Sequence, residues 1–233
     1  MMPEQAFVDE LVDSFAQRYE NAPALRESIS LFTIEAHGVR KRFGESLPLR
    51  CLDLGCGPGI ISRALAELGF EVIGIDPSER MIGAARHLSN RRANGCASAN
   101  FIKADVAEFI SIAPGPFSLI ISSNVLQYQM DPLEVVKRAA LHLQPGGTLA
   151  FSIPNRDSVL RVTEPWFQAF LPASLRNRKF WANELGPSDY IATLVDFDLS
   201  LERVKTFGLS APAESVLASH WLQTMALLVF RRL

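Results

Sequence analysis

The sequence has few of the residues that build disulfide frameworks, metal sites or membrane spans. Its three cysteines, Cys51, Cys56 and Cys96, form no C-x-x-C pair, so we expect neither a disulfide scaffold nor a metal site. So few cysteines are typical of a reducing compartment, which predicts a cytoplasmic protein. No apolar run approaches the roughly 20 residues of a transmembrane helix, and no signal peptide is evident at the N-terminus. We therefore expect no membrane partner.

The chain also lacks an excess of basic residues. Lys and Arg number 23 against 25 Asp and Glu, which gives a formal net charge of −2. A protein that mainly binds nucleic acid normally carries a basic excess, so such a partner is not expected. The remaining composition, 48% hydrophobic and 21% charged, is ordinary for a globular protein. A length of 233 residues predicts one domain with additions, as a monomer or homodimer.

What the sequence does contain is a regular alternation of short apolar segments with amphipathic ones. The predicted strands are 49–54, 70–75, 100–103, 117–122 and 148–153. The predicted helices are 60–68, 78–88 with Ser78 as N-cap, 106–110 and 132–143, the last followed by a turn at 144–147. This alternation predicts an α/β fold with a doubly wound, mostly parallel sheet that is covered on both faces.

The segments on either side of this core differ from it. Residues 1–44 are predicted to form an N-terminal helical cap, in which Pro23 opens the second helix. Residues 155–190 interrupt the alternation and are rich in aromatics, which indicates a helical lid insertion over an apolar acceptor. Residues 191–233 are predicted to close the sheet with strands at 199–207 and 221–230. The whole chain, 1–233 with its core at 45–154, is thus interpreted as one domain.

The most informative motif is the glycine-rich turn Asp53–Gly59 between the first strand and the following helix. Glycines permit a sharp turn and let a ligand approach the backbone, and the helix N-terminus offers N–H donors to an anionic group. A dinucleotide-binding fingerprint would place Gly or Ala at position 60, where this chain has Ile60. The turn therefore predicts a nucleotide-like cofactor other than a dinucleotide.

The stretch Leu52–Gly59 resembles the first motif of class I S-adenosylmethionine-dependent methyltransferases of the small-molecule type, and the likeness extends over roughly residues 45–155. The resemblance implies a Rossmann-like, seven-stranded sheet with an antiparallel last strand. It also implies S-adenosyl-L-methionine as cofactor, with S-adenosyl-L-homocysteine as product. The implied reaction transfers a methyl group to a small, partly apolar organic acceptor.

Three side chains would then bind the adenosine, of which Asp76 and Asp105 fall at two successive strand ends and Met81 lies on the first turn of the helix after the second strand. Asp76 would accept the ribose hydroxyls, Met81 would cover the adenine, and Asp105 would accept the adenine amino group unless it only caps a helix. The other cofactor contacts suggested by the resemblance are Tyr19, Asp53, Gly55, Cys56, Gly57, Gly59, Pro77, Ala104, Val106, Ser122, Asn124 and Gln127.

The acceptor side of the reaction is less specified by the sequence. Methyl transfer from a sulfonium depends mainly on alignment, so the lack of an evident base does not argue against it. His37 and Tyr128 are candidates for a catalytic role, although His37 can equally lie on a helix surface and Tyr128 can pack a loop. Two alternatives stay open: a tRNA or protein methyltransferase, and a non-methylating member of the fold that binds S-adenosylmethionine.

Overall fold

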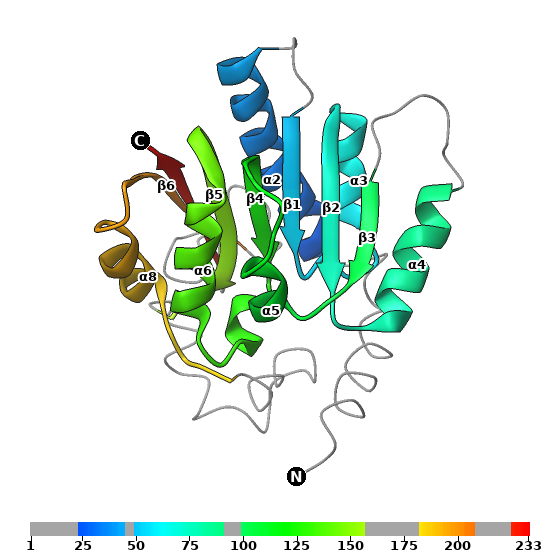
Figure 1. Ribbon diagram of the computed structural model, residues 1–233. Coiled ribbons are helices and arrows are strands. Elements are labelled where there is room, and N and C mark those ends of the chain that lie inside the picture. The colour runs from blue at the N-terminus through cyan, green and yellow to red at the C-terminus, as the bar shows by residue number, and fades with distance from the viewer. Residues whose placement is uncertain (1–22, 45–48, 91–98, 157–181, 208–224) are drawn as a thin grey trace.

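The protein folds around a single twisted sheet (Figure 1), and the computed structural model describes residues 23–44, 49–90, 99–156, 182–207 and 225–233. The sheet has seven strands in the order β3-β2-β1-β4-β5-β7-β6. Their bounds are β1 Leu49–Leu54, β2 Phe70–Asp76, β3 Ala99–Lys103, β4 Phe117–Ser123, β5 Leu143–Pro154, β6 Leu199–Phe207 and β7 Met225–Arg232. The first five strands are parallel, and β7 is antiparallel to both β5 and β6. The predicted sheet, including its antiparallel last strand, is confirmed.

Helices cover the two faces of this sheet. They are α2 Pro23–Phe43, α3 Ile60–Glu67, α4 Glu79–Asn90, α5 Val106–Ile110, α6 Pro132–Leu141 and α8 Pro187–Leu194, with a short 3-10 turn η1 at Leu126–Tyr128. One core lies under α2 and α3 and includes Phe32, Leu65 and Phe70. The other lies under α5, α6 and α8. Burial on both faces explains why all seven residues of β4 are buried and why the strands read as apolar runs.

Strand β5 is longer than the sequence predicts. The turn expected at 144–147 belongs to β5, which begins at Leu143, while α6 already ends at Leu141. Leu143 pairs with Phe117 of β4, and the register shifts before Leu119 pairs with Thr148. The Gly-rich residues, with Gly146 at φ 76°, lie in this irregular part of the strand. They therefore form a bend within β5 and not a turn before it.

The chain after β5 is only partly described. The predicted lid 155–190 falls mostly on residues 157–181, outside the described part of the chain, and the predicted boundary at 190 lies inside α8. This helix packs on the sheet through Tyr190, whose ring centroid lies 5.2 Å from that of Phe151. The strand predicted at 221–230 corresponds to β7, and 221–224 lie outside the described residues.

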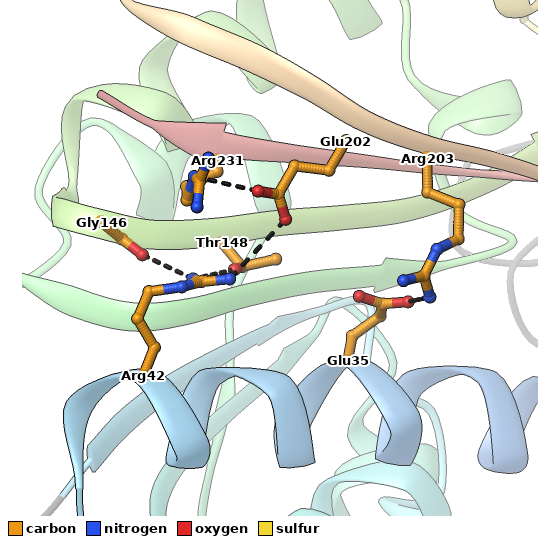
Figure 2. A network of polar contacts seen from close by, with 7 residues as sticks. All are labelled: Glu35, Arg42, Gly146, Thr148, Glu202, Arg203 and Arg231. Atoms are coloured by element: carbon orange, nitrogen blue, oxygen red, sulfur yellow. Dashed lines mark hydrogen bonds and ion pairs between the residues drawn. The ribbon is translucent and has the colours of Figure 1, made fainter.

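Polar contacts connect α2 to strands β5 and β6 of the sheet (Figure 2). Arg203 of β6 donates to the Glu35 carboxylate of α2 at 2.5 Å, and Arg42 contacts the Gly146 carbonyl at 2.7 Å. Glu202 of β6 lies 3.6 Å from Arg42 and 2.9 Å from Arg231. Glu35 is 9% exposed, and its burial raises the pKa of the carboxyl while Arg203 opposes that rise. Among the described helices, none is long and apolar enough to cross a membrane.

Candidate functional site

The candidate site lies at the edge of the sheet where the parallel strands have their carboxyl ends, the position at which open α/β sheets bind ligands. Two backbone hydrogen bonds join neighbouring strand ends there. The Cys56 amide donates to the Ile75 carbonyl at 2.8 Å, and the Ala104 amide donates to the Asp76 carbonyl at 3.1 Å. The glycine turn, the end of β2 and the end of β3 thus form one continuous backbone surface.

The three positions of the turn require glycine for different structural reasons. All are left-handed, with φ of 73° at Gly55, 53° at Gly57 and 73° at Gly59. A Cβ at Gly55 would lie 2.2 Å from Val125 Cγ2, and one at Gly59 would lie 2.6 Å from Phe101 Cζ, so neither position has space for a side chain. A Cβ at Gly57 would meet nothing within 4 Å among the described residues. Gly57 therefore presents open backbone to a ligand.

Asp76 closes this open turn from the end of β2. Its Oδ2 accepts a hydrogen bond from the Gly57 amide at 3.0 Å, and its Oδ1 accepts one from the Ser78 amide at 2.9 Å. Burial raises the pKa of this carboxyl, and the two hydrogen bonds oppose the rise. Since each carboxylate oxygen has two lone pairs, each can accept a further hydrogen bond. Asp76 can thus bind two hydroxyl groups while it holds the turn.

Asp53 lies beneath the turn and is 1% exposed. Its Oδ2 accepts a short hydrogen bond of 2.6 Å from the Ser62 hydroxyl of α3. Burial raises the pKa of Asp53 to about 7, although the bond to Ser62 acts in the opposite direction. Through this hydrogen bond to Ser62, Asp53 connects β1 to α3 below the turn. Sequence reasoning missed Ser62; a serine among the buried positions Ile61 and Leu65 was the available signal.

Three side chains beside the turn, those of Cys56, Ser78 and Met81, are buried. Cys56 is 9% exposed, and burial raises the pKa of its thiol far above the usual range, so the thiol stays protonated. Ser78 caps α4 as predicted, because its hydroxyl accepts from the Met81 amide at 3.3 Å. Met81 is 8% exposed on the first turn of the helix, and Pro77 is exposed beside it.

Asp105 follows β3 and caps α5 in the structure. Its Oδ1 accepts from the Ala107 amide at 2.8 Å and from the Glu108 amide at 3.1 Å. The carboxylate is exposed, Ala104 is half-buried, and Val106 is 1% exposed in the core. The capping bonds use only Oδ1, so the second oxygen stays available to a ligand at this edge.

The end of β4 forms the opposite side of the candidate site. Ser122 donates its hydroxyl to the Leu54 carbonyl at 3.2 Å and so ties β4 to the start of the turn. Asn124 has a φ of 59°, a left-handed conformation that is uncommon for a residue with a side chain. Gln127 is 6% exposed and donates through Nε2 to the Asn124 carbonyl at 3.0 Å. Tyr128 is half-buried at the end of η1.

One predicted site residue, His37, does not join this group. His37 is exposed on α2, whose buried side carries Phe32, Glu35 and Ala36, so its side chain faces away from the sheet. Tyr19 lies outside the described residues. Over the described ranges, no group of three His, Cys, Asp or Glu side chains could hold a metal ion.

One contact near η1 could not be predicted from the sequence. Asn183 donates through Nδ2 to the carbonyls of Leu126 and Gln129, at 2.8 and 2.9 Å. These partners are 57 and 54 residues away in sequence. A lone Asn in a loop has no spacing that would reveal such a contact.

The chain matches a known protein family. Residues 11–193 match the family described as "Methyltransferase domain". The match covers most of the chain, which therefore belongs to this family of methyltransferase domains.

Individual relatives add detail. The chain is 30% identical over 159 residues to a ubiquinone biosynthesis O-methyltransferase of Xanthomonas campestris pv. campestris, which covers 66% of this chain and 64% of the relative. This chain thus spans somewhat less than two thirds of the length of that relative. It is 36% identical over 109 residues to the ubiquinone biosynthesis O-methyltransferase of Aromatoleum aromaticum, which covers 46% of this chain and 45% of that protein.

Solved structures share the fold. Magnesium protoporphyrin IX methyltransferase from Synechocystis PCC 6803, with bound S-adenosylhomocysteine, has a TM-score of 0.64 at 20% identity, over 88% of this chain and 84% of that one. The N-methyltransferase NodS from Bradyrhizobium japonicum WM9, also with S-adenosylhomocysteine, has a TM-score of 0.62 at 20% identity, over 92% and 90%. At such identities the likeness concerns the fold.

Proposed function

We propose that the protein is an S-adenosylmethionine-dependent methyltransferase that acts on a small, partly apolar organic acceptor. The observation that carries the proposal is the pairing of the open turn at Gly57 with the Asp76 carboxylate at the end of β2. Membership in the methyltransferase-domain family supports it. Two structural neighbours of the same fold hold S-adenosylhomocysteine, which further supports this cofactor.

The residues at the sheet edge fit an adenosine-based cofactor. Asp76 offers two carboxylate oxygens for the ribose hydroxyls, while Asp105 offers a free oxygen and Ala104 and Val106 offer backbone groups for the adenine. Met81 on the first turn of α4 and Pro77 just before that helix would cover the base. The backbone at Gly55, Cys56, Gly57 and Gly59, with Ser122, Asn124 and Gln127 opposite, would bind the methionine part. Asp53 would act from below by holding the turn, and Tyr19 would contact the cofactor from the N-terminal segment.

The protein's contribution to the reaction would be alignment. When bound, the cofactor supplies a methyl group that is already activated on a sulfonium. The rigid turn and the left-handed Asn124 hold the binding edge in one geometry, which lowers the entropic cost of bringing the two reactants together. Tyr128 adjoins this edge and is the remaining candidate for contact with the acceptor, since His37 faces away from it.

For the acceptor, we propose a phenolic hydroxyl group on a ring that carries an apolar substituent. The relatives named ubiquinone biosynthesis O-methyltransferases support oxygen as the methylated atom. The aromatic residues counted in the segment 155–190 support an apolar substituent, and the near-neutral net charge of −2 argues against a polyanionic acceptor.

Ligand-induced thermal stabilisation tests the cofactor assignment. S-adenosylhomocysteine at about 100 times its Kd should stabilise the fold by about 2.7 kcal/mol, whereas NAD should leave the melting temperature unchanged. Stabilisation by NAD alone, or by neither ligand, would refute the proposal. The acceptor class is tested by incubating the protein with S-adenosylmethionine and a panel of alkyl-substituted catechols and by measuring a one-methyl gain in product mass.

A further inference from the structure

One buried polar atom at the candidate site has no partner among the residues that the structure describes. The Gln127 side chain is 6% exposed, and its Oε1 accepts no hydrogen bond there. Its Nε2 donates to the Asn124 carbonyl at 3.0 Å. Only the NH₂ end can face that carbonyl, because an amide oxygen would repel it, so Oε1 must point elsewhere. A buried acceptor is normally satisfied, which points to a donor on a ligand.

The backbone around Gln127 is held by a segment from a distant part of the sequence. The Ala182 amide donates to the Gln127 carbonyl at 2.9 Å. Asn183 Nδ2 donates to the Leu126 and Gln129 carbonyls on either side, at 2.8 and 2.9 Å. The carbonyls of residues 126, 127 and 129 are thus all bound by two consecutive residues.

The amide of Asn183 is itself held in one orientation. Its Oδ1 accepts from the Leu185 amide at 3.2 Å, which directs Nδ2 toward η1. The other end of the Gln127 contact is fixed as well, because the Asn124 amide donates to the Ser152 hydroxyl at 3.0 Å and that hydroxyl donates to Asn124 Oδ1 at 3.3 Å. Gln127 therefore lies between two restrained backbone segments.

We propose that Asn183 is a positioning residue that holds Gln127 so that its Oε1 accepts a hydrogen bond from an ammonium or hydroxyl donor of the bound reactants. This inference rests on the proposed function. Two sources could supply the donor, namely the amino group of the cofactor's methionine part and the hydroxyl of the acceptor. Asn183 acts through η1 and touches neither.

The test is a double-mutant cycle on Asn183 and Gln127. Asn183→Asp keeps the size of the side chain and the bond from Leu185 but loses both donors to η1. Gln127→Met removes the acceptor with little change in volume. Binding of S-adenosylhomocysteine and of 5′-methylthioadenosine, which lacks the amino acid part, is measured by calorimetry for each variant. The exposed Asn100→Ala on β3 is the control variant.

If the donor belongs to the cofactor, each single variant should weaken S-adenosylhomocysteine binding on the order of tenfold and leave 5′-methylthioadenosine binding unchanged. If it belongs to the acceptor, S-adenosylhomocysteine binding should persist, and the KM for an alkylcatechol probe should rise by a similar factor. In either case Asn183→Asp should add less than about twofold in the Gln127→Met background, because the two residues act as one unit.

The proposal is overturned if Asn183→Asp changes neither quantity, or if it has the same effect with and without Gln127. Should Asn183→Asp lower the melting temperature of the ligand-free protein strongly, Asn183→Ser, which keeps one donor, is measured in the same cycle and should give a smaller, equally coupled effect. A wild-type protein that binds S-adenosylhomocysteine normally while the cycle shows no coupling refutes only this inference. A wild-type protein that does not bind S-adenosylhomocysteine refutes the proposed function itself.

Discussion

Asp76 Oδ2 accepts a hydrogen bond from the Gly57 amide at 3.0 Å and so joins the end of β2 to the turn after β1. Because Oδ1 is bound by the Ser78 amide in the same way, the orientation of the carboxylate is fixed before any ligand arrives. A fixed carboxylate loses little side-chain entropy on binding, which favours affinity.

Asp76→Ala should therefore weaken S-adenosylhomocysteine binding by about 100-fold, since two hydrogen bonds to a charged group are lost. Calorimetry on the folded variant measures this directly. The exposed Asp196→Ala, on the loop after α8, removes the same charge away from the site and should bind normally. Equal affinities for Asp76→Ala and wild type would remove Asp76 from the ribose role.

The glycines of the turn should respond differently to the same substitution. Gly57→Ala places its Cβ in open space, so its cost to the free energy of unfolding should be only the left-handed backbone penalty of about 1–2 kcal/mol. Gly55→Ala carries the same penalty and also drives its Cβ to 2.2 Å from Val125 Cγ2, so it should destabilise the fold considerably more.

Ligand affinity separates these two effects. Gly57→Ala should lower S-adenosylhomocysteine affinity much more than its stability loss suggests, because the new methyl group occupies the space of the ligand. Urea unfolding and calorimetry on both variants give the comparison. If Gly57→Ala bound the ligand as wild type does, the open backbone at Gly57 would not be the binding surface.

Sequence reasoning reaches those parts of the fold in which neighbouring residues carry the signal. The apolar runs of β1 and β4 and the capping serine Ser78 are local, and each is found where the sequence predicts it. Strand β5 was too short in the prediction because its first residues pair with β4 across an irregular register, which depends on Phe117 and not on local propensity.

The same reasoning separates the predicted and missed parts of the site. Asp53, Asp76 and Asp105 each follow a strand or lie near its end, so their place at the sheet edge can be read from the sequence. Their partners cannot: Ser62 becomes visible only when α3 packs on β1, and Asn183 only when the chain returns to η1. Long-range hydrogen bonds have no period or spacing that a sequence could show.

The buried Asp53 should make stability depend on pH. Its pKa in the folded protein is about 7, above the usual value of 3.8, so the folded state holds a proton that the unfolded state has lost between these values. The resulting cost is absent below about pH 4, grows as pH rises, and is complete above about pH 7.

Asp53→Asn removes this titration and keeps an oxygen that can accept from Ser62. As pH rises from 5 to 8, the stability of the variant relative to wild type should increase by roughly 2–3 kcal/mol, because the Asp53 cost grows over about 2 pH units up to its folded pKa and each unit corresponds to about 1.4 kcal/mol. Urea unfolding of both proteins across this range measures the difference. The exposed Asp196→Asn should show no such gain, and a constant difference for Asp53→Asn would mean that Asp53 does not titrate there.

The ion pair between Glu35 and Arg203 should stabilise the packing of α2 against β6 (Figure 2). Arg203→Ala leaves a carboxylate that is 9% exposed without its 2.5 Å partner, so the protein should lose stability. Because the Arg203 side chain is itself 51% exposed, solvent screening limits the loss to about 1 kcal/mol.

The pH dependence identifies the cause of that loss. Burial already raises the pKa of Glu35, and removal of Arg203 should raise it further, so the unfolded state loses its proton at a lower pH than the folded state. The destabilisation by Arg203→Ala should therefore be small where Glu35 is protonated and should grow as pH rises through its folded pKa. Glu35→Gln is the matched background, because it has no charge to leave unpaired, and there Arg203→Ala should have little effect at any pH. An equal loss of stability in both backgrounds would show that Arg203 contributes by packing and not by its charge.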